Sequence, residues 1–216
     1  MLRFDPNDPF PLVDVSYADA KEHASKVDAG IGLKIEEAEE AARERLRSVE
    51  GQQLWLKLPI QTMLTPYVEI RQILHEIRVK PGQHVIDLGA GYGRMGFVIA
   101  RHHPEVSFTG YEYVRERVEE GARHLPGGDI RLVEADLSKA EFVPADADVY
   151  FIYDYGTHDA IRKTLDDLRD IAVRHKIIVV GRGRASRDLI ERQCPWLSQV
   201  FSPRHFQNFS IYRSAD

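Results

Sequence analysis

Residues 85–96 read Val85-Ile86-Asp87-Leu88-Gly89-Ala90-Gly91-Tyr92-Gly93-Arg94-Met95-Gly96. An apolar run with an acid near its end passes through glycines into a helical pattern. Glycines are needed where a ligand approaches backbone amides at a helix N-terminus, because a Cβ atom blocks either the turn or the contact. This stretch therefore predicts a β-strand, a ligand-binding loop and the start of a helix.

Apolar runs and helical patterns alternate from this point onward. We expect helices at about 94–102, 114–124, 159–174 and 186–193, and strands at 84–88, 106–111, 130–134, 148–153 and 176–180. Such alternation predicts right-handed βαβ crossovers and a parallel sheet with helices on both faces.

The C-terminal segment departs from the alternation. Two strand-like runs, 197–201 and 206–212, are joined by only four residues, so they predict an antiparallel hairpin. The expected fold class is α/β, with a doubly wound, mostly parallel seven-stranded sheet, a C-terminal antiparallel hairpin and an N-terminal helical extension.

The N-terminal part has a different pattern. Residues 1–32 mix proline, aspartate and isolated aromatics, which predicts an extended or partly ordered arm. Residues 34–49 show the spacing of an amphipathic helix that ends at Gly51. Residues 55–64 are apolar enough to pack or to form a lid, and Pro66 opens a helix that runs to about Arg78.

Composition favours one globular domain with an extension. The chain has 216 residues, of which 43% are hydrophobic and 29% charged, and no run approaches the roughly 18 apolar residues of a membrane span. The first ten residues lack the features of a secretory signal, and Cys194 is the only cysteine, so we expect a cytoplasmic protein. The net charge of -5, with interleaved signs, argues against nucleic acid as a partner, but it does not exclude a local basic patch. The sequence leaves the oligomeric state open.

The glycine-rich stretch has two interpretations. Gly91, Gly93 and Gly96 match the dinucleotide pattern GxGxxG, and Glu112 lies about twenty residues on, where an acid binds ribose hydroxyls. That pattern alone suggests NAD. However, Asp87 stands just before the first glycine, where a carboxylate repels a pyrophosphate but suits a ligand that carries an ammonium and a sulfonium.

On these residues the chain resembles the class I S-adenosylmethionine-dependent methyltransferases, whose first motif is an acid followed by GxGxG. The resemblance covers about Thr65 to Tyr212. It implies S-adenosyl-L-methionine as cofactor, an N-terminal arm and helical extension at 1–64 and a Rossmann-like methyltransferase domain at 65–216. It also implies that Asp87 lies near the methionine amino group and that Glu112 accepts both ribose hydroxyls.

The resemblance extends to the adenine and methionine ends of the cofactor. It implies that Asp136 accepts from the adenine amine, that Leu137 packs on the ring, and that Tyr67 covers the methionine end. The residues expected to bind the cofactor are Tyr67, Asp87, Gly89, Ala90, Gly91, Tyr92, Gly93, Glu112, Tyr113, Asp136, Leu137 and Asp154.

Candidate catalytic residues follow the fourth strand. A methyl sulfonium is already an activated electrophile, so the protein mainly aligns an acceptor, excludes water and accommodates loss of a proton. Asp154 is expected to orient the acceptor. Tyr155 either faces the sulfonium or the acceptor, or it packs, and His158 is either a base or a surface residue. Arg182 and Arg184, after the fifth strand, either grip an acidic acceptor or face solvent.

Motifs of several methyltransferase subclasses are missing. No Asn/Asp-Pro-Pro-Tyr signature follows the fourth strand, and Gly181-Arg182-Gly183-Arg184 replaces the carboxylate and amide of a magnesium site, so no metal is expected. A protein or small-molecule acceptor remains. Thr65-Pro66-Tyr67 resembles the entry to the first motif in non-SET protein lysine methyltransferases, which favours protein lysine. An NAD-linked oxidoreductase and a non-catalytic cofactor-binding partner subunit are the alternatives.

Overall fold

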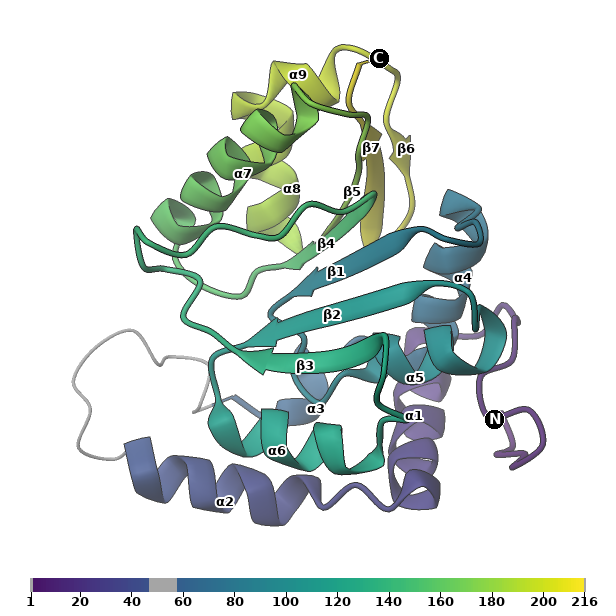
Figure 1. Ribbon diagram of the computed structural model, residues 1–216. Helices are drawn as coiled ribbons and strands as arrows, with labels where there is room; N and C mark the ends of the chain where they lie inside the picture. The colour runs from purple at the N-terminus through teal and green to yellow at the C-terminus, as the bar shows by residue number, and fades with distance from the viewer. Residues whose placement is uncertain (1, 47–57, 216) are drawn as a thin grey trace.

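The computed structural model describes residues 2–46 and 58–215. Its centre is a seven-stranded sheet in the order β3-β2-β1-β4-β5-β7-β6, with helices on both faces (Figure 1). Strands β1 to β5 pair in parallel, and β7 is antiparallel to β5 and to β6. The predicted fold class is confirmed. The strands are β1 (His84–Leu88), β2 (Ser107–Glu112), β3 (Ile130–Glu134), β4 (Val149–Tyr153), β5 (Ile178–Arg182), β6 (Arg204–His205) and β7 (Phe209–Arg213).

Helices form a layer on each side of the sheet. In Figure 1, α7, α8 and α9 lie on one side, while α5 and α6 lie on the other with α1 and α2 outside them. The helices are α1 (Tyr17–Ile31), α2 (Ile35–Leu46), α3 (Ile60–Met63), α4 (Tyr67–Ile77), α5 (Arg94–His102), α6 (Arg115–His124), α7 (His158–Ala172), α8 (Arg184–Gln193) and α9 (Pro195–Ser198).

The sheet divides the hydrophobic core in two. Val85 and Phe151 pack with residues of α1, α4 and α5, whereas their neighbours Ile86 and Ile152 pack with residues of α7 and α8. Successive side chains of a strand point to opposite faces, so a strand that is covered on both sides is apolar throughout. This explains the unbroken apolar runs in the sequence.

Strand order places a crevice at one edge of the sheet. The order reverses between β1 and β4, which are neighbours although β2 and β3 intervene in sequence. In doubly wound sheets, ligands bind outside the carboxyl ends of the strands at such a reversal. The loops after β1 and β4 are therefore the ones positioned to build a site.

The predicted extended arm is wrong for residues 17–31, which form α1. Ser16 Oγ accepts a hydrogen bond from the Asp19 amide at its start, and Gly32, at φ 92°, ends the helix in the left-handed conformation. Apart from Val27, its buried face is made of small and polar residues, so the hydrophobic periodicity was weak: Ala20, His23, Ala24 and Asp28.

The other N-terminal predictions are partly covered by the described residues. The amphipathic helix is confirmed as α2, which starts at Ile35 and is described as far as Leu46. Its predicted end at Gly51 lies outside the described residues, as do residues 55–57 of the predicted packing segment. The remainder of that segment contains the short helix α3, and Pro66 is the N-cap of α4.

The predicted strand at 197–201 is wrong. Pro195 begins the short helix α9, and Leu197 is fully buried in the core. Proline suits the first turn of a helix because it lacks the amide proton that such a position leaves unpaired. The antiparallel hairpin is confirmed, but its first strand, β6, lies in the predicted link.

Within residues 2–46 and 58–215, no helix combines the length and the apolar character needed to cross a membrane.

Candidate cofactor site and acceptor pocket

The glycine-rich loop begins where β1 ends. The amides of Gly89 and Ala90 both donate to the carbonyl oxygen of Tyr111 on β2, at 2.9 Å. Gly89 has φ 92°, and a Cβ atom there would lie 2.6 Å from the Cβ of Tyr155. Only glycine therefore fits, because both the backbone conformation and the space exclude a side chain.

Glu112 ties the end of β2 to this loop. One carboxylate oxygen accepts from the amide of Gly91 at 2.8 Å, and the other accepts from the amide of Val114 at 2.9 Å. The residue is 6% exposed. A carboxylate has about four acceptor positions, so each oxygen can also accept a hydroxyl proton. The predicted role in binding ribose stays a prediction.

Asp87 lies beneath the loop with an unsatisfied carboxylate. Its Oδ1 is buried and has no hydrogen-bond partner among the described residues. Burial, together with the negative charge of Glu112, raises the pKa of Asp87 to about 8. A buried acceptor without a partner costs free energy, and a cationic group beside it would remove that cost. These residues therefore fit a cofactor that carries an ammonium group.

Two tyrosines predicted to bind the cofactor are fully buried. The hydroxyl of Tyr67 donates to Oδ1 of Asp28 on α1 at 2.8 Å, and that of Tyr92 donates to Oε1 of Glu39 on α2 at 2.8 Å. Their hydroxyls thus connect the loop region to the N-terminal helices. Whether their rings touch the cofactor stays a prediction.

The residues expected at the adenine end follow β2 and β3. Tyr113 is half-buried directly after Glu112. Oδ1 of Asp136 accepts from the amide of Ser138 at 3.0 Å and from its hydroxyl at 2.6 Å, which closes a turn. Leu137 is buried in the core cluster on the α7 side. Adenine recognition by Asp136 and Leu137 stays a prediction.

Asp154, at the end of β4, binds the start of α8. Its Oδ1 accepts from the amide and the hydroxyl of Ser186, both at 2.7 Å, and its Oδ2 accepts from the amide of Ala185 at 3.2 Å. Its φ of 30° is left-handed. A carboxylate stabilises a helix N-terminus through the free amides and the helix dipole. Sequence reasoning missed this contact because 32 residues separate Asp154 from Ser186.

The other candidate catalytic residues lie in different environments. The hydroxyl of Tyr155 hydrogen bonds to Thr164 Oγ1 on α7, and burial raises its pKa. Its side chain lies against Gly89. His158 is exposed at the first position of α7. The predicted packing and surface interpretations thus agree with these positions, and the catalytic ones stay predictions.

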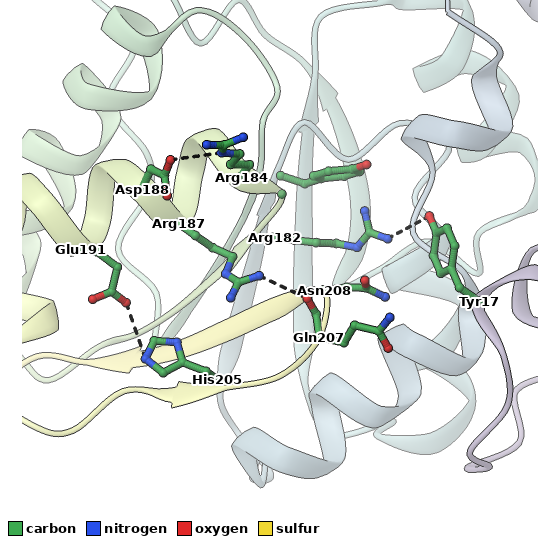
Figure 2. Close-up of a pocket in the computed structure, with 11 residues that line it drawn as sticks. Tyr17, Arg182, Arg184, Arg187, Asp188, Glu191, His205, Gln207 and Asn208 are labelled. Carbon is green, nitrogen blue, oxygen red and sulfur yellow. Dashed lines mark hydrogen bonds and ion pairs between the residues drawn. The ribbon is translucent and has the colours of Figure 1, made fainter.

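A pocket of about 510 Å³ opens beside the ends of β4 and β5 (Figure 2). Arg182 faces it from β5, but its guanidinium pairs with Glu69 at 2.5 Å, bonds to the hydroxyl of Tyr17 and is almost fully buried. Arg182 therefore forms a buried ion pair within the protein and does not face solvent as one interpretation predicted. Arg184 is 93% exposed beside Asp188, and Arg187 donates to the carbonyl oxygen of Gln207. The lining residues are Tyr17, Tyr153, Arg182, Gly183, Arg184, Arg187, Asp188, Glu191, His205, Gln207 and Asn208.

In the described part of the chain, no group of three or more His, Cys, Asp or Glu side chains is arranged to hold a metal ion.

The fold and the loop define a nucleotide-binding α/β domain, and comparisons with known proteins give its class. Residues 85–173 match the family described as Methyltransferase domain. Ribosomal RNA small subunit methyltransferase A of Prosthecochloris aestuarii is 32% identical over 82 residues, which are 38% of this chain and 30% of the relative. The match thus spans less than a third of that relative's length.

Solved structures share the fold. An RNA methyltransferase from Salinibacter ruber, in complex with S-adenosyl-L-homocysteine, superposes with a TM-score of 0.50 at 21% identity, over 70% of this chain and 92% of that chain. A TehB-like SAM-dependent methyltransferase from Corynebacterium glutamicum superposes with a TM-score of 0.51 at 15% identity, over 82% of this chain and 97% of that chain.

The segment from β1 to the end of α7, which is less than half of the chain, matches the domain of S-adenosylmethionine-dependent methyltransferases. The match to such a domain implies binding of S-adenosylmethionine and of its product, S-adenosylhomocysteine.

Proposed function

We propose that the protein transfers the methyl group of S-adenosylmethionine to a nitrogen or oxygen atom of an acceptor that enters beside β4 and β5. The main support for this proposal is the carboxyl group of Asp87, which lies under a glycine-rich loop and has a buried oxygen without a partner. A cationic group of the ligand would stabilise it. An NAD pyrophosphate would instead bring negative charge to a site that already holds Asp87 and Glu112.

Each group of residues has a distinct task in this proposal. Asp87 binds the amino group of the cofactor, and Glu112 binds the ribose while it holds the loop through the amide of Gly91. The bound cofactor supplies a methyl group on a sulfonium, which needs no further activation. Tyr155 packs against Gly89 of the loop, and its hydroxyl is held by Thr164 of α7. The chain therefore acts mainly by holding two reactants in line and by excluding water.

RNA is the acceptor that the observations favour. Two similar proteins are named RNA methyltransferases, and one is the curated relative. Arg184 and Arg187 line the pocket beside β5, where they can meet phosphate groups. A net charge of -5 describes the whole chain and does not exclude contacts of these two arginines with phosphate, although Asp188 and Glu191 line the same pocket.

Protein lysine, which Thr65-Pro66-Tyr67 favours, is the alternative acceptor. Tyr67 is fully buried and bonds to Asp28, so the motif lies inside the protein. In the pocket, the guanidinium of Arg182 already lies over the ring of Tyr153, at 4.2 Å, and near that of Tyr17. Each of these two rings therefore already has a cation on one face, which disfavours a lysine ammonium there.

Labelling with tritiated S-adenosylmethionine tests the acceptor. The protein is incubated with cell lysate, and the products are divided between ribonuclease and protease digestion. Label that ribonuclease releases is the expected result. Label that only protease releases would replace RNA by a protein acceptor, and label in the small-molecule fraction would exclude both.

Substitution of Asp154 separates its proposed role in orienting the acceptor from its role as a cap at the start of α8. Asn at position 154 keeps an oxygen for the amide of Ser186, whereas Ala removes it. We expect both variants to lose methyl transfer to lysate RNA, but only Asp154→Ala to lose about 1–2 kcal/mol of stability through the lost helix cap. Turnover and thermal unfolding are the measurements. Wild-type turnover by Asp154→Asn would reduce this residue to a helix cap.

A further inference from the structure

Two N-terminal helices each place one buried acid against the cofactor loop. Asp28 of α1 is 3% exposed, and Glu39 of α2 is 4% exposed. Each acid pairs with a buried arginine of the methyltransferase domain, namely Arg94 and Arg117. Both arginines lie within the family match, whereas both acids precede it, because the match begins at residue 85.

Glu39 is linked through Arg117 to Glu112, the acid that binds the ribose in the proposed function. Its two carboxylate oxygens accept from Nε and Nη2 of Arg117 at 2.7 and 3.0 Å. Nη1 of the same guanidinium lies 3.8 Å from Oε1 of Glu112. Arg117 thus stands between two carboxylates, and its fork is bound on the Glu39 side.

This arrangement leaves Glu112 free of a bidentate arginine. Its oxygens bind two backbone amides and keep further acceptor positions. Nη1 of Arg117 already lies 3.8 Å from Glu112, so without the charge of Glu39 the guanidinium would turn its fork to Glu112. The positions needed for ribose hydroxyls would then be occupied.

Asp28 braces the other end of the loop in the same manner. Arg94, the first residue of α5, donates from Nε to Oδ1 of Asp28 at 3.2 Å, and its Nη2 binds Oδ2. Nη1 donates to the carbonyl oxygen of Thr65 and Nη2 to the side chain of Gln61, which join α3 and the start of α4 to the loop.

Buried ion pairs are a costly way to stabilise a fold, because desolvation offsets much of the attraction. Apolar residues of similar size at these positions would pack equally well without this cost. Two such pairs at one loop therefore point to a positional task. We infer that Glu39 is a positioning residue that holds Arg117 away from Glu112 and so keeps the ribose site open.

This inference rests on the proposed function, and calorimetric titration with S-adenosylhomocysteine tests it in the full-length protein. Glu39→Gln preserves the size and the hydrogen bond from Tyr92 but removes the charge. We expect about tenfold weaker binding. Glu37→Gln, on the exposed side of the same helix, is the matched control and leaves the affinity unchanged.

A double variant shows whether Glu39 acts through Glu112. If it does, Glu39→Gln combined with Glu112→Gln binds no more weakly than Glu112→Gln alone, because coupled residues are not additive. Multiplied effects would overturn the inference. A merely structural role would lower the unfolding temperature of the ligand-free protein and leave the affinity of the folded protein unchanged, which would also overturn it.

Two further outcomes are distinguishable. Failure of the wild-type protein to bind S-adenosylhomocysteine removes the cofactor assignment on which the inference rests, whereas wild-type binding with an unaffected Glu39→Gln variant removes the inference alone. If Glu39→Gln does not fold, Arg117→Lys keeps the charge but loses the bidentate grip on Glu39. A lysine has no fork with which to occupy Glu112, so this variant is expected to keep the wild-type affinity, and clearly weaker binding would overturn the inference.

Discussion

We expect Asp87→Asn to remove a steep loss of stability that the ligand-free wild-type protein should undergo as the pH rises from about 4 to about 8. Burial and the charge of Glu112 raise the pKa of Asp87 from 3.8 to about 8 in the folded protein. Between these values the folded state holds a proton that the unfolded state has lost, so stability falls with rising pH. The slope approaches about 1.4 kcal/mol per pH unit.

Urea denaturation at several pH values between 5 and 7 measures this effect. Asp129→Asn, a substitution in an exposed loop, is the control and keeps the wild-type slope. Equal slopes in the wild-type protein and in Asp87→Asn would mean that Asp87 is ionised in the folded, ligand-free state, which contradicts the account of this carboxylate.

Ligand binding is expected to show the opposite pH dependence at the same residue. An ammonium group beside Asp87 favours the carboxylate, so S-adenosylhomocysteine binds more tightly as the pH rises toward 8. Asp87→Asn binds weakly and without this dependence.

Glu112→Gln is expected to weaken S-adenosylhomocysteine about 30-fold, or about 2 kcal/mol, because the charge-assisted bonds to the ribose are lost. An amide has only one oxygen, and the backbone amides of Gly91 and Val114 compete for it. Titration calorimetry measures the change. Glu134→Gln, at the paired position on β3 and exposed, is the control. Unchanged affinity in Glu112→Gln would mean that the ribose lies elsewhere.

The central sheet was predictable because its signals are local. Strand β1, the glycine turn and helix α5 were predicted at their observed bounds, since an apolar run, glycines and a 3.6-residue period lie within twenty residues of one another. The parallel pairing of β1 to β5 followed from the alternation of strands and helices, whereas the order of the strands was not predicted. The C-terminal segment was misassigned because a short apolar run fits a strand and a buried helical turn equally well.

The bracing of the site was not predictable in this way. Asp28 and Arg94 are 66 residues apart, and Glu39 and Arg117 are 78 apart. In the sequence, Glu39 is one of many acids on an amphipathic helix, and no local pattern marks it as buried. Asp154 was recognised as an acid at the correct edge of the sheet, but its contact with α8 depends on the packing of β4 beside β5.

Calorimetric titration of the wild-type protein with S-adenosylhomocysteine, and in parallel with NADH, tests the cofactor assignment most directly. The account predicts one-site binding of S-adenosylhomocysteine and no heat from NADH. Binding of NADH without a response to S-adenosylhomocysteine would contradict it.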